Sequence, residues 1–193
     1  MKELVVIDAC VRGGESRTRR IAAPIIEALK DRYAVTEYRL FEMDGVVPLT
    51  PESFRERNEG RIPAWALECS KTIAEADRIL IAAPFWDMGI PAVLKAFFEQ
   101  TSLFDVTFTD NGKACVGLCR CEKVLFVTTR GMAIPTGDPR EQATPYLRAL
   151  SALWGLGEVT TVAATGMDYS TPEEIEKKTS EAVAEGLAVA EGF

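Results

Sequence analysis

The fold of this chain is decided by residues 78–99, which read RILIAAPFWDMGIPAVLKAFFE. The stretch begins with a mostly apolar run, 78–83, which is typical of a strand buried on both faces of a parallel sheet. A turn with bulky side chains follows, and Pro91 stands where the first turn of a helix accepts a proline. Apolar residues then recur at spacings of three and four, which predicts an amphipathic helix with one apolar stripe: Ile90, Val93, Leu94, Phe97 and Phe98.

The same alternation of strand and helix extends in both directions along the chain. Apolar runs predict further strands at 4–7 and 124–129, an alternating pattern predicts one at 35–40, and a fifth strand is expected at 159–164. Helices are expected at 17–32, 63–76, 142–154 and 171–190. Strands that alternate with helices predict an α/β fold, in which a doubly wound, five-stranded parallel sheet carries helices on both faces. We expect one domain spanning residues 1–193, with the strand order 2-1-3-4-5.

Three segments qualify this simple alternation. Pro24 lies inside the first predicted helix and should kink it or mark its true start. Residues 41–62 are rich in proline, glycine and charge, and we expect them to form a long connection. Residues 104–121 alternate in polarity around Asp110-Asn111-Gly112, which predicts a hairpin excursion from the sheet.

The composition excludes several classes of function. Lys and Arg number 22 against 29 Asp and Glu, and this net charge of −7 opposes broad nucleic-acid binding. The chain has no histidine, which excludes Ser-His-Asp and Cys-His catalysis and His-ligated zinc. No apolar run reaches the length of about 18 residues that a transmembrane helix needs, and the apolar N-terminal stretch is short for a signal peptide. We therefore expect a cytoplasmic protein without a membrane partner, whose chemistry rests on other side chains or on a borrowed cofactor.

The first chemistry-bearing segment follows the first strand, at the edge of the sheet where this fold places its ligands. Residues 10–20 read CVRGGESRTRR, and their four Arg and one Glu give a local charge of +3 in an acidic protein. Ser16 and Thr18 stand at the start of a helix, whose free N–H groups favour an anion. The segment predicts a site for a phosphate monoester, or alternatively a capped helix with a solvated basic turn.

Two further segments follow the third and fourth strands. The turn after residue 83 carries large apolar side chains, which would suit the wall of a site for a planar aromatic ligand or would pack on the protein's own core. The turn after residue 128 contains Gly131, which permits close approach to a ligand or is an ordinary turn glycine.

A separate stretch brings together Cys115, Cys119 and Cys121, which would share one face of an extended segment. We favour free structural thiols there over a redox pair or a metal site, because the spacing is not a usual zinc pattern.

These segments together resemble a known family. The strongest match is Ala83–Glu99, with Ala-Pro, two bulky residues and then Ile-Pro-x-x-Leu-Lys-x-Phe-Phe-Glu. Phe108–Gly112, Val127–Gly131 and Thr144–Leu147 match in the same order and at similar spacing. On these motifs the chain resembles the FMN-dependent NADH-azoreductases, a branch of the flavodoxin-like NAD(P)H:quinone oxidoreductases, over nearly its whole length.

The resemblance implies a flavodoxin-like fold, bound FMN, NADH or NADPH as co-substrate, and a quinone, azo compound or similar small molecule as electron acceptor. It also implies a homodimer with the flavin near the interface. The apolar stripe of residues 90–99 is one candidate for that contact, although core packing alone explains the stripe about as well. The flavin carries the chemistry, so no catalytic side chain and no metal are expected. The residues that the resemblance places at the cofactor are Cys10, Ser16, Arg17, Thr18, Pro84, Phe85, Trp86, Asp87, Met88, Thr129, Arg130, Gly131 and Met132.

This chain departs from the family pattern at three of those positions. Cys10 stands where a phosphate-contacting serine is frequent, Asp87 replaces the usual asparagine, and Met132 replaces a second glycine. Two other functions are compatible with the same fold, a non-enzymatic flavodoxin-type electron carrier and, with less support from the residues, a phosphoester hydrolase. Rapid turnover with NADH would separate the enzyme from the carrier.

Overall fold

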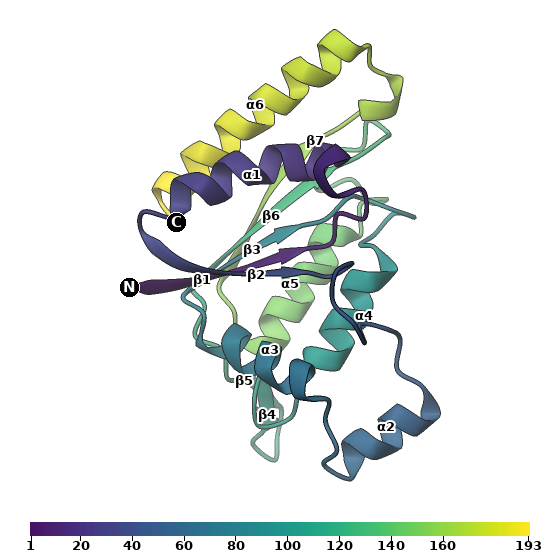
Figure 1. Ribbon diagram of the computed structural model, residues 1–193, viewed down its shortest axis with the longest axis vertical. Coiled ribbons are helices and arrows are strands. Elements are labelled where there is room, and N and C mark those ends of the chain that lie inside the picture. Colours follow the sequence, from purple (N-terminus) through teal and green to yellow (C-terminus); the bar gives the residue numbers. More distant parts are fainter.

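A five-stranded parallel sheet runs through the middle of the computed structural model, which describes residues 1–193 (Figure 1). The strands are β1 (Lys2–Asp8), β2 (Tyr33–Arg39), β3 (Arg78–Ala82), β6 (Lys123–Thr129) and β7 (Glu158–Ala164). They pair in the order β2-β1-β3-β6-β7, which is 2-1-3-4-5 when only the strands of this sheet are counted. The predicted α/β fold with a five-stranded parallel sheet is confirmed.

Helices cover both faces of the sheet. The chain forms α1 (Arg17–Leu29), α2 (Pro51–Asn58), α3 (Ala64–Glu75), α4 (Ala92–Thr101), α5 (Ala143–Trp154) and α6 (Pro172–Glu191), with 3₁₀ turns η1 (Gly13–Glu15) and η2 (Met167–Tyr169), and all of the helices except α2 pack on the sheet. In Figure 1, α1 and α6 lie side by side on one face, while α3, α4 and α5 lie on the other. None of these helices is both long enough and apolar enough to cross a membrane.

Successive side chains of β1 point to opposite faces of the sheet, and the strand therefore contributes to a hydrophobic core on each face. Val5 and Ile7 belong to a cluster of 23 buried residues shared with α3, α4 and α5. Leu4 and Val6 point the other way, into a cluster of 18 buried residues shared with α1 and α6. Successive side chains of a strand face opposite sides, so a strand between two helical layers is apolar at every position.

Two expectations about helices were wrong. Residues 41–62 are not only a connection, because α2 forms within them, and Figure 1 shows it standing away from the sheet. Its start is fixed by a capping box, in which Thr50 and Ser53 each bond the other's backbone N–H. Pro24 does not mark the start of α1, which begins at Arg17 and continues through the proline.

The apolar stripe of residues 90–99 packs largely in the core, which is one of the two roles that we considered for it. Leu94, Phe97 and Phe98 are at most 2% exposed and pack in the core between α4 and the sheet. Only Ile90 and Val93 are half-buried. Core packing within one chain therefore accounts for the buried part of the stripe.

The hairpin comprises β4 (Phe108–Asp110) and β5 (Cys115–Gly117), which pair antiparallel outside the main sheet. The three cysteines do not share a face, because Cys115 is exposed while Cys119 and Cys121 are buried. Burial raises the pKa of the Cys119 thiol to about 12 and that of Cys121 to about 11. All five cysteines of the chain are free thiols, and no group of three or more His, Cys, Asp or Glu side chains is arranged to hold a metal.

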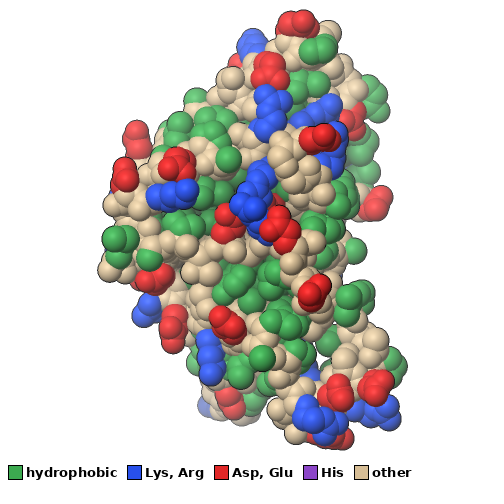
Figure 2. Space-filling view, in the orientation of Figure 1, with side chains coloured by type: hydrophobic (Ala, Val, Ile, Leu, Met, Phe, Trp, Pro, Cys, Tyr) green, Lys and Arg blue, Asp and Glu red, His purple; other side chains and the backbone are tan.

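Acidic and basic side chains are interspersed over the face of the molecule drawn in Figure 2. Many of them form exposed ion pairs, such as Lys95 with Glu99 and Lys177 with Glu181. Such pairs each contribute little to stability. The fold therefore depends on its two apolar cores rather than on surface charge.

The contact between the hairpin and α5 gives a first prediction. A Cβ atom at Gly117 would collide with the backbone of Trp154 and Gly155, so Gly117→Ala should lower the free energy of unfolding by about 1–3 kcal/mol. Gly192→Ala is the control, because its Cβ would meet nothing closer than 3.9 Å and should change stability by less than about 0.5 kcal/mol. Urea unfolding of the wild type and the two variants measures both effects. Equal stability of the two variants would show that Gly117 is not tightly packed against the end of α5.

Candidate functional site

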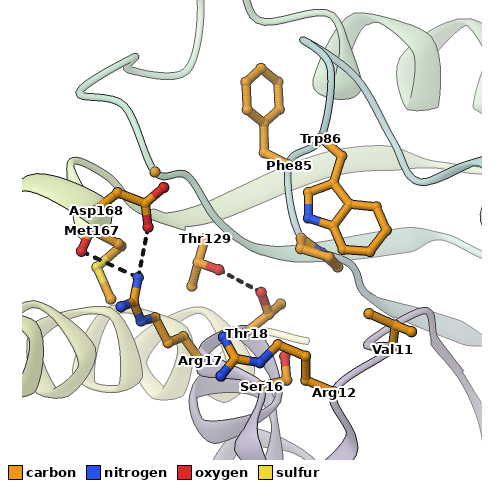
Figure 3. Close-up of a pocket in the computed structure, with 12 residues that line it drawn as sticks. Val11, Arg12, Ser16, Arg17, Thr18, Phe85, Trp86, Thr129, Met167 and Asp168 are labelled. Atoms are coloured by element: carbon orange, nitrogen blue, oxygen red, sulfur yellow. Dashed lines mark hydrogen bonds and ion pairs between the residues drawn. The ribbon is translucent and has the colours of Figure 1, made fainter.

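A cavity of about 160 Å³ opens at the carboxyl edge of the sheet, between the loops that follow β1, β3, β6 and β7 (Figure 3). These loops converge because parallel strands all end at the same edge. The cavity is lined by Val11, Arg12, Ser16, Arg17, Thr18, Pro84, Phe85, Trp86, Thr129, Gly131, Met167 and Asp168. In Figure 3 the polar residues from the start of α1 lie on one side and the two aromatic rings on the other.

The start of α1 forms the polar side. Ser16 is the N-cap residue, and its Oγ accepts a hydrogen bond of 3.3 Å from the N–H of Arg19. The N–H groups of Arg17 and Thr18 belong to the first turn of α1, where a helix offers no carbonyl acceptor. No carbonyl outside the helix accepts from them either. Two backbone donors at the positive end of a helix dipole therefore face the cavity, which favours an anion there.

Thr18 joins this helix to the neighbouring wall. Its side chain is fully buried, and its Oγ1 lies 2.7 Å from the Oγ1 of Thr129 at the end of β6. The bond fixes the first turn of α1 against the sheet. A ligand held by the helix start is thereby also placed against the loop after β6.

The loop after β3 supplies the aromatic side. Phe85 is 8% exposed, while Trp86 is 44% exposed at the mouth of the cavity. Trp86 and Gly89 exchange two backbone hydrogen bonds of 3.2 and 2.8 Å, which close a two-residue turn. The residues at the tip, Asp87 and Met88, have φ angles of 46° and 65°, as a type I′ turn requires. This strained turn holds the aromatic wall in place.

The loops after β6 and β7 close the third side. Arg17 Nη1 lies 3.0 Å from Asp168 Oδ1 and donates a hydrogen bond of 3.2 Å to the carbonyl of Met167. A Cβ atom at Gly131 would collide with the Asp168 carboxylate as it is placed here, so a larger residue would displace that carboxylate from its contact with Arg17. The glycine that we expected to approach a ligand thus also leaves room for the Asp168 side chain.

A buried ion pair supports the wall from behind. The Arg130 side chain is fully buried and donates to the Ile134 carbonyl at 2.9 Å and to Thr136 Oγ1 at 3.0 Å. Its guanidinium carbon lies 5.5 Å from the centre of the Phe85 ring, and its Nη2 lies 3.7 Å from an oxygen of Glu141. Burial lowers the pKa of Arg130, and the nearby Glu141 carboxylate opposes that shift. Arg130 therefore positions Phe85 and does not itself line the cavity.

Eight of the thirteen residues predicted at the cofactor line this cavity: Ser16, Arg17, Thr18, Pro84, Phe85, Trp86, Thr129 and Gly131. The other five do not: Cys10, Asp87, Met88, Arg130 and Met132. The Cys10 thiol is buried and donates to the Ala82 carbonyl at 3.6 Å, and burial raises its pKa to about 11. Met88 and Met132 are both 38% exposed.

Four lining residues were not predicted: Val11, Arg12, Met167 and Asp168. Arg12 was counted only in the charge of the basic segment. Met167 and Asp168 belong to η2, which is a single 3₁₀ turn. A turn this short has no hydrophobic periodicity, so no pattern in the sequence predicts it. The one available signal was Gly166, whose φ of 69° starts that turn immediately after the last strand of the sheet.

A second, larger cavity of about 610 Å³ adjoins the first and shares Trp86 with it. Asp87 lines this second cavity, together with apolar residues such as Phe41, Ile90 and Tyr146. The first cavity thus offers anion donors and an aromatic wall, which fit a planar aromatic ligand that carries a phosphate monoester. The second offers open, mostly apolar space for another planar molecule beside it.

Comparisons with known proteins agree with this geometry. A family model described as the flavodoxin-like fold matches residues 2–188. The FMN-dependent NADH:quinone oxidoreductase 2 of Clostridium acetobutylicum is 30% identical over 163 residues, which cover 80% of this chain and 81% of that protein.

Solved structures agree on the fold. An azoreductase from Bacillus anthracis superposes with a TM-score of 0.84 at 20% identity, with 100% of both chains covered. An FMN-dependent NADH-azoreductase from the same species, solved in complex with FMN, superposes with a TM-score of 0.77 at 19% identity over 98% of this chain and 100% of that chain.

The buried pair behind the aromatic wall gives a prediction that needs no ligand. Glu141→Gln should lower the free energy of unfolding by about 3 kcal/mol, because it leaves the buried Arg130 guanidinium without a counter-charge. The matched control is Glu176→Gln, which breaks the exposed pair with Arg20 and should cost less than about 1 kcal/mol. Denaturant unfolding of both variants is the measurement, and a loss for Glu141→Gln no larger than the control's would show that the pair does not stabilise this wall.

Proposed function

The chain belongs to the flavodoxin-like family, among the FMN-dependent NADH:quinone oxidoreductases, and we propose that it binds one FMN in the first cavity and reduces quinones, azo compounds or similar acceptors with NADH or NADPH. The observation that carries this proposal is the pairing of an anion-binding helix start with an aromatic wall across one cavity. FMN combines a phosphate monoester with a planar ring system, and each part has a matching side of the cavity.

The phosphate is assigned to the start of α1. The N–H groups of Arg17 and Thr18 are free to donate to it, and Ser16 holds the helix start in the required geometry. The ring is assigned to the space between the loops after β3 and β6. There, Phe85 and Trp86 supply apolar contact, and the Thr129–Gly131 segment supplies backbone groups near the ring edge.

When bound, FMN would supply the hydride-transfer chemistry between the reduced nicotinamide and the acceptor. The protein binds and orients the reactants, which agrees with the absence of histidine from the chain. The second cavity lies beside Trp86 and is mostly apolar, so it suits a nicotinamide or a quinone ring. Because the relatives are enzymes, we favour this activity over the electron-carrier and hydrolase alternatives.

We also propose a homodimer. Trp86, Met88, Phe41 and Met132 are large apolar side chains, each at least 38% exposed, and they lie in or follow the loops that form the two cavities. A second copy that covers these residues would exclude water from the site. Light scattering of the purified protein measures this association.

The first functional prediction concerns FMN itself. The purified protein should be yellow or should take up one FMN per chain, and Ser16→Asp should weaken that binding at least about tenfold, because a carboxylate would face the phosphate. Thr50→Asp is the matched control, since it places the same residue at the exposed N-cap of α2. Aspartate is a good N-cap at both positions, so both variants should fold. Failure of the wild type to bind FMN at micromolar concentration would overturn the proposal.

The second functional prediction concerns the order of the reaction. If the nicotinamide and the acceptor use the same exposed side of the ring in turn, they exclude each other, and initial rates should follow ping-pong kinetics. Double-reciprocal plots at several fixed concentrations of a quinone should give parallel lines. Intersecting lines would show that both substrates bind together, contrary to a shared site.

A further inference from the structure

We propose that Arg12 alone supplies the side-chain cation for the phosphate of the bound flavin, and that this contact makes the chain select FMN over riboflavin. The proposal rests on the proposed function. Arg12 and Arg17 are the two cationic residues that line the cavity. Of the two, only Arg12 has a guanidinium without a close ion-pair partner. Figure 3 draws both side chains at the polar side of the cavity, beside Ser16 and Thr18.

Arg17 is committed to the opposite wall. Its Nη1 is shared between the Asp168 carboxylate at 3.0 Å and the Met167 carbonyl at 3.2 Å, both from the turn after β7. The side chain is 33% exposed, so the pair is partly shielded from water. The guanidinium thus serves as a brace between α1 and η2, and its charge is balanced by a carboxylate.

The other two arginines of the basic segment are committed outside the cavity. Arg19 pairs with Asp8 and, at 3.1 Å, with Glu37, on the β1–β2 side of α1. Arg20 makes two contacts of 2.7 and 2.8 Å with the carboxylate of Glu176 on α6. Neither residue lines the cavity. The local charge of +3 is therefore largely neutralised by acids that lie outside the basic segment.

Arg12 has no comparable partner. It stands in the loop between β1 and α1, its side chain is 64% exposed, and its nearest carboxylate is that of Glu15 at 3.8 Å. Glu15 is itself 84% exposed, so this pair is weak and readily exchanged for a stronger acceptor. A phosphate dianion at the start of α1 is such an acceptor, and guanidinium binds it through two parallel hydrogen bonds.

This assignment separates the two ends of the ligand. The aromatic wall and the loop after β6 would bind the ring of riboflavin and of FMN alike, because the two molecules share that ring. Arg12 would contribute only when the phosphate is present. Its contribution should also grow with pH, because the phosphate gains its second charge near pH 6.

The experiment compares FMN and riboflavin binding to the flavin-free protein, by fluorescence quenching, for the wild type, Arg12→Met and Arg20→Met. We expect Arg12→Met to weaken FMN binding about tenfold or more at pH 7.5 and to change riboflavin binding less than about twofold. The gain in FMN affinity between pH 5 and pH 7.5 should shrink in the same variant. Arg20→Met removes an equal charge from the same helix start and should leave the ratio of the two affinities unchanged.

Arg17→Met completes the comparison. Because Arg17 braces the cavity, its loss should weaken FMN and riboflavin binding by similar factors. The assignment to Arg12 would be overturned if Arg12→Met left the ratio of FMN affinity to riboflavin affinity unchanged, or if Arg17→Met lowered that ratio instead. Either result would leave the proposed function intact. A wild type that binds neither flavin would overturn the proposed function itself.

Discussion

The parallel sheet has a single carboxyl edge, and every loop of the candidate site depends on that constraint. Parallel strands point the same way, so β1, β3, β6 and β7 all deliver their following loops to one place. Helices must cover both faces to bury the apolar centres of strands such as β1 and β3, and α1, which covers one face, begins near that edge. An anion-binding helix start beside three loops is thus a consequence of the topology, and the individual residues decide what it binds.

The parts of the molecule that could be predicted from the sequence are those encoded locally. The strands appeared as short apolar or alternating stretches, and Ser16 and the turn around Trp86 could be located because each lies in the loop that follows a strand. Helix α2 was missed because its capping box uses Ser53 at the third position, where the recognised pattern has Glu or Gln. The same arrangement with Glu174 marks the start of α6 plainly.

The roles of Arg17 and Arg20 could not be predicted, because their partners lie far away in the chain. The partner of Arg17 is 151 positions away, and that of Arg20 is 156 positions away. Similarly, Arg130 stands in a loop that faces the cavity, yet its side chain turns behind Phe85 to meet Glu141. Sequence alone gives the position of a charge along the chain, whereas the fold decides whether that charge is already balanced.

The two left-handed residues at the tip of the 86–89 turn limit how far this protein can be made heat-resistant without altering its site. Positive φ at Asp87 and Met88 costs conformational energy that glycine would avoid. Glycine at position 87, however, would delete a carboxylate from the edge of the second cavity. A glycine chosen for stability alone would therefore change the lining of the second cavity beside Trp86.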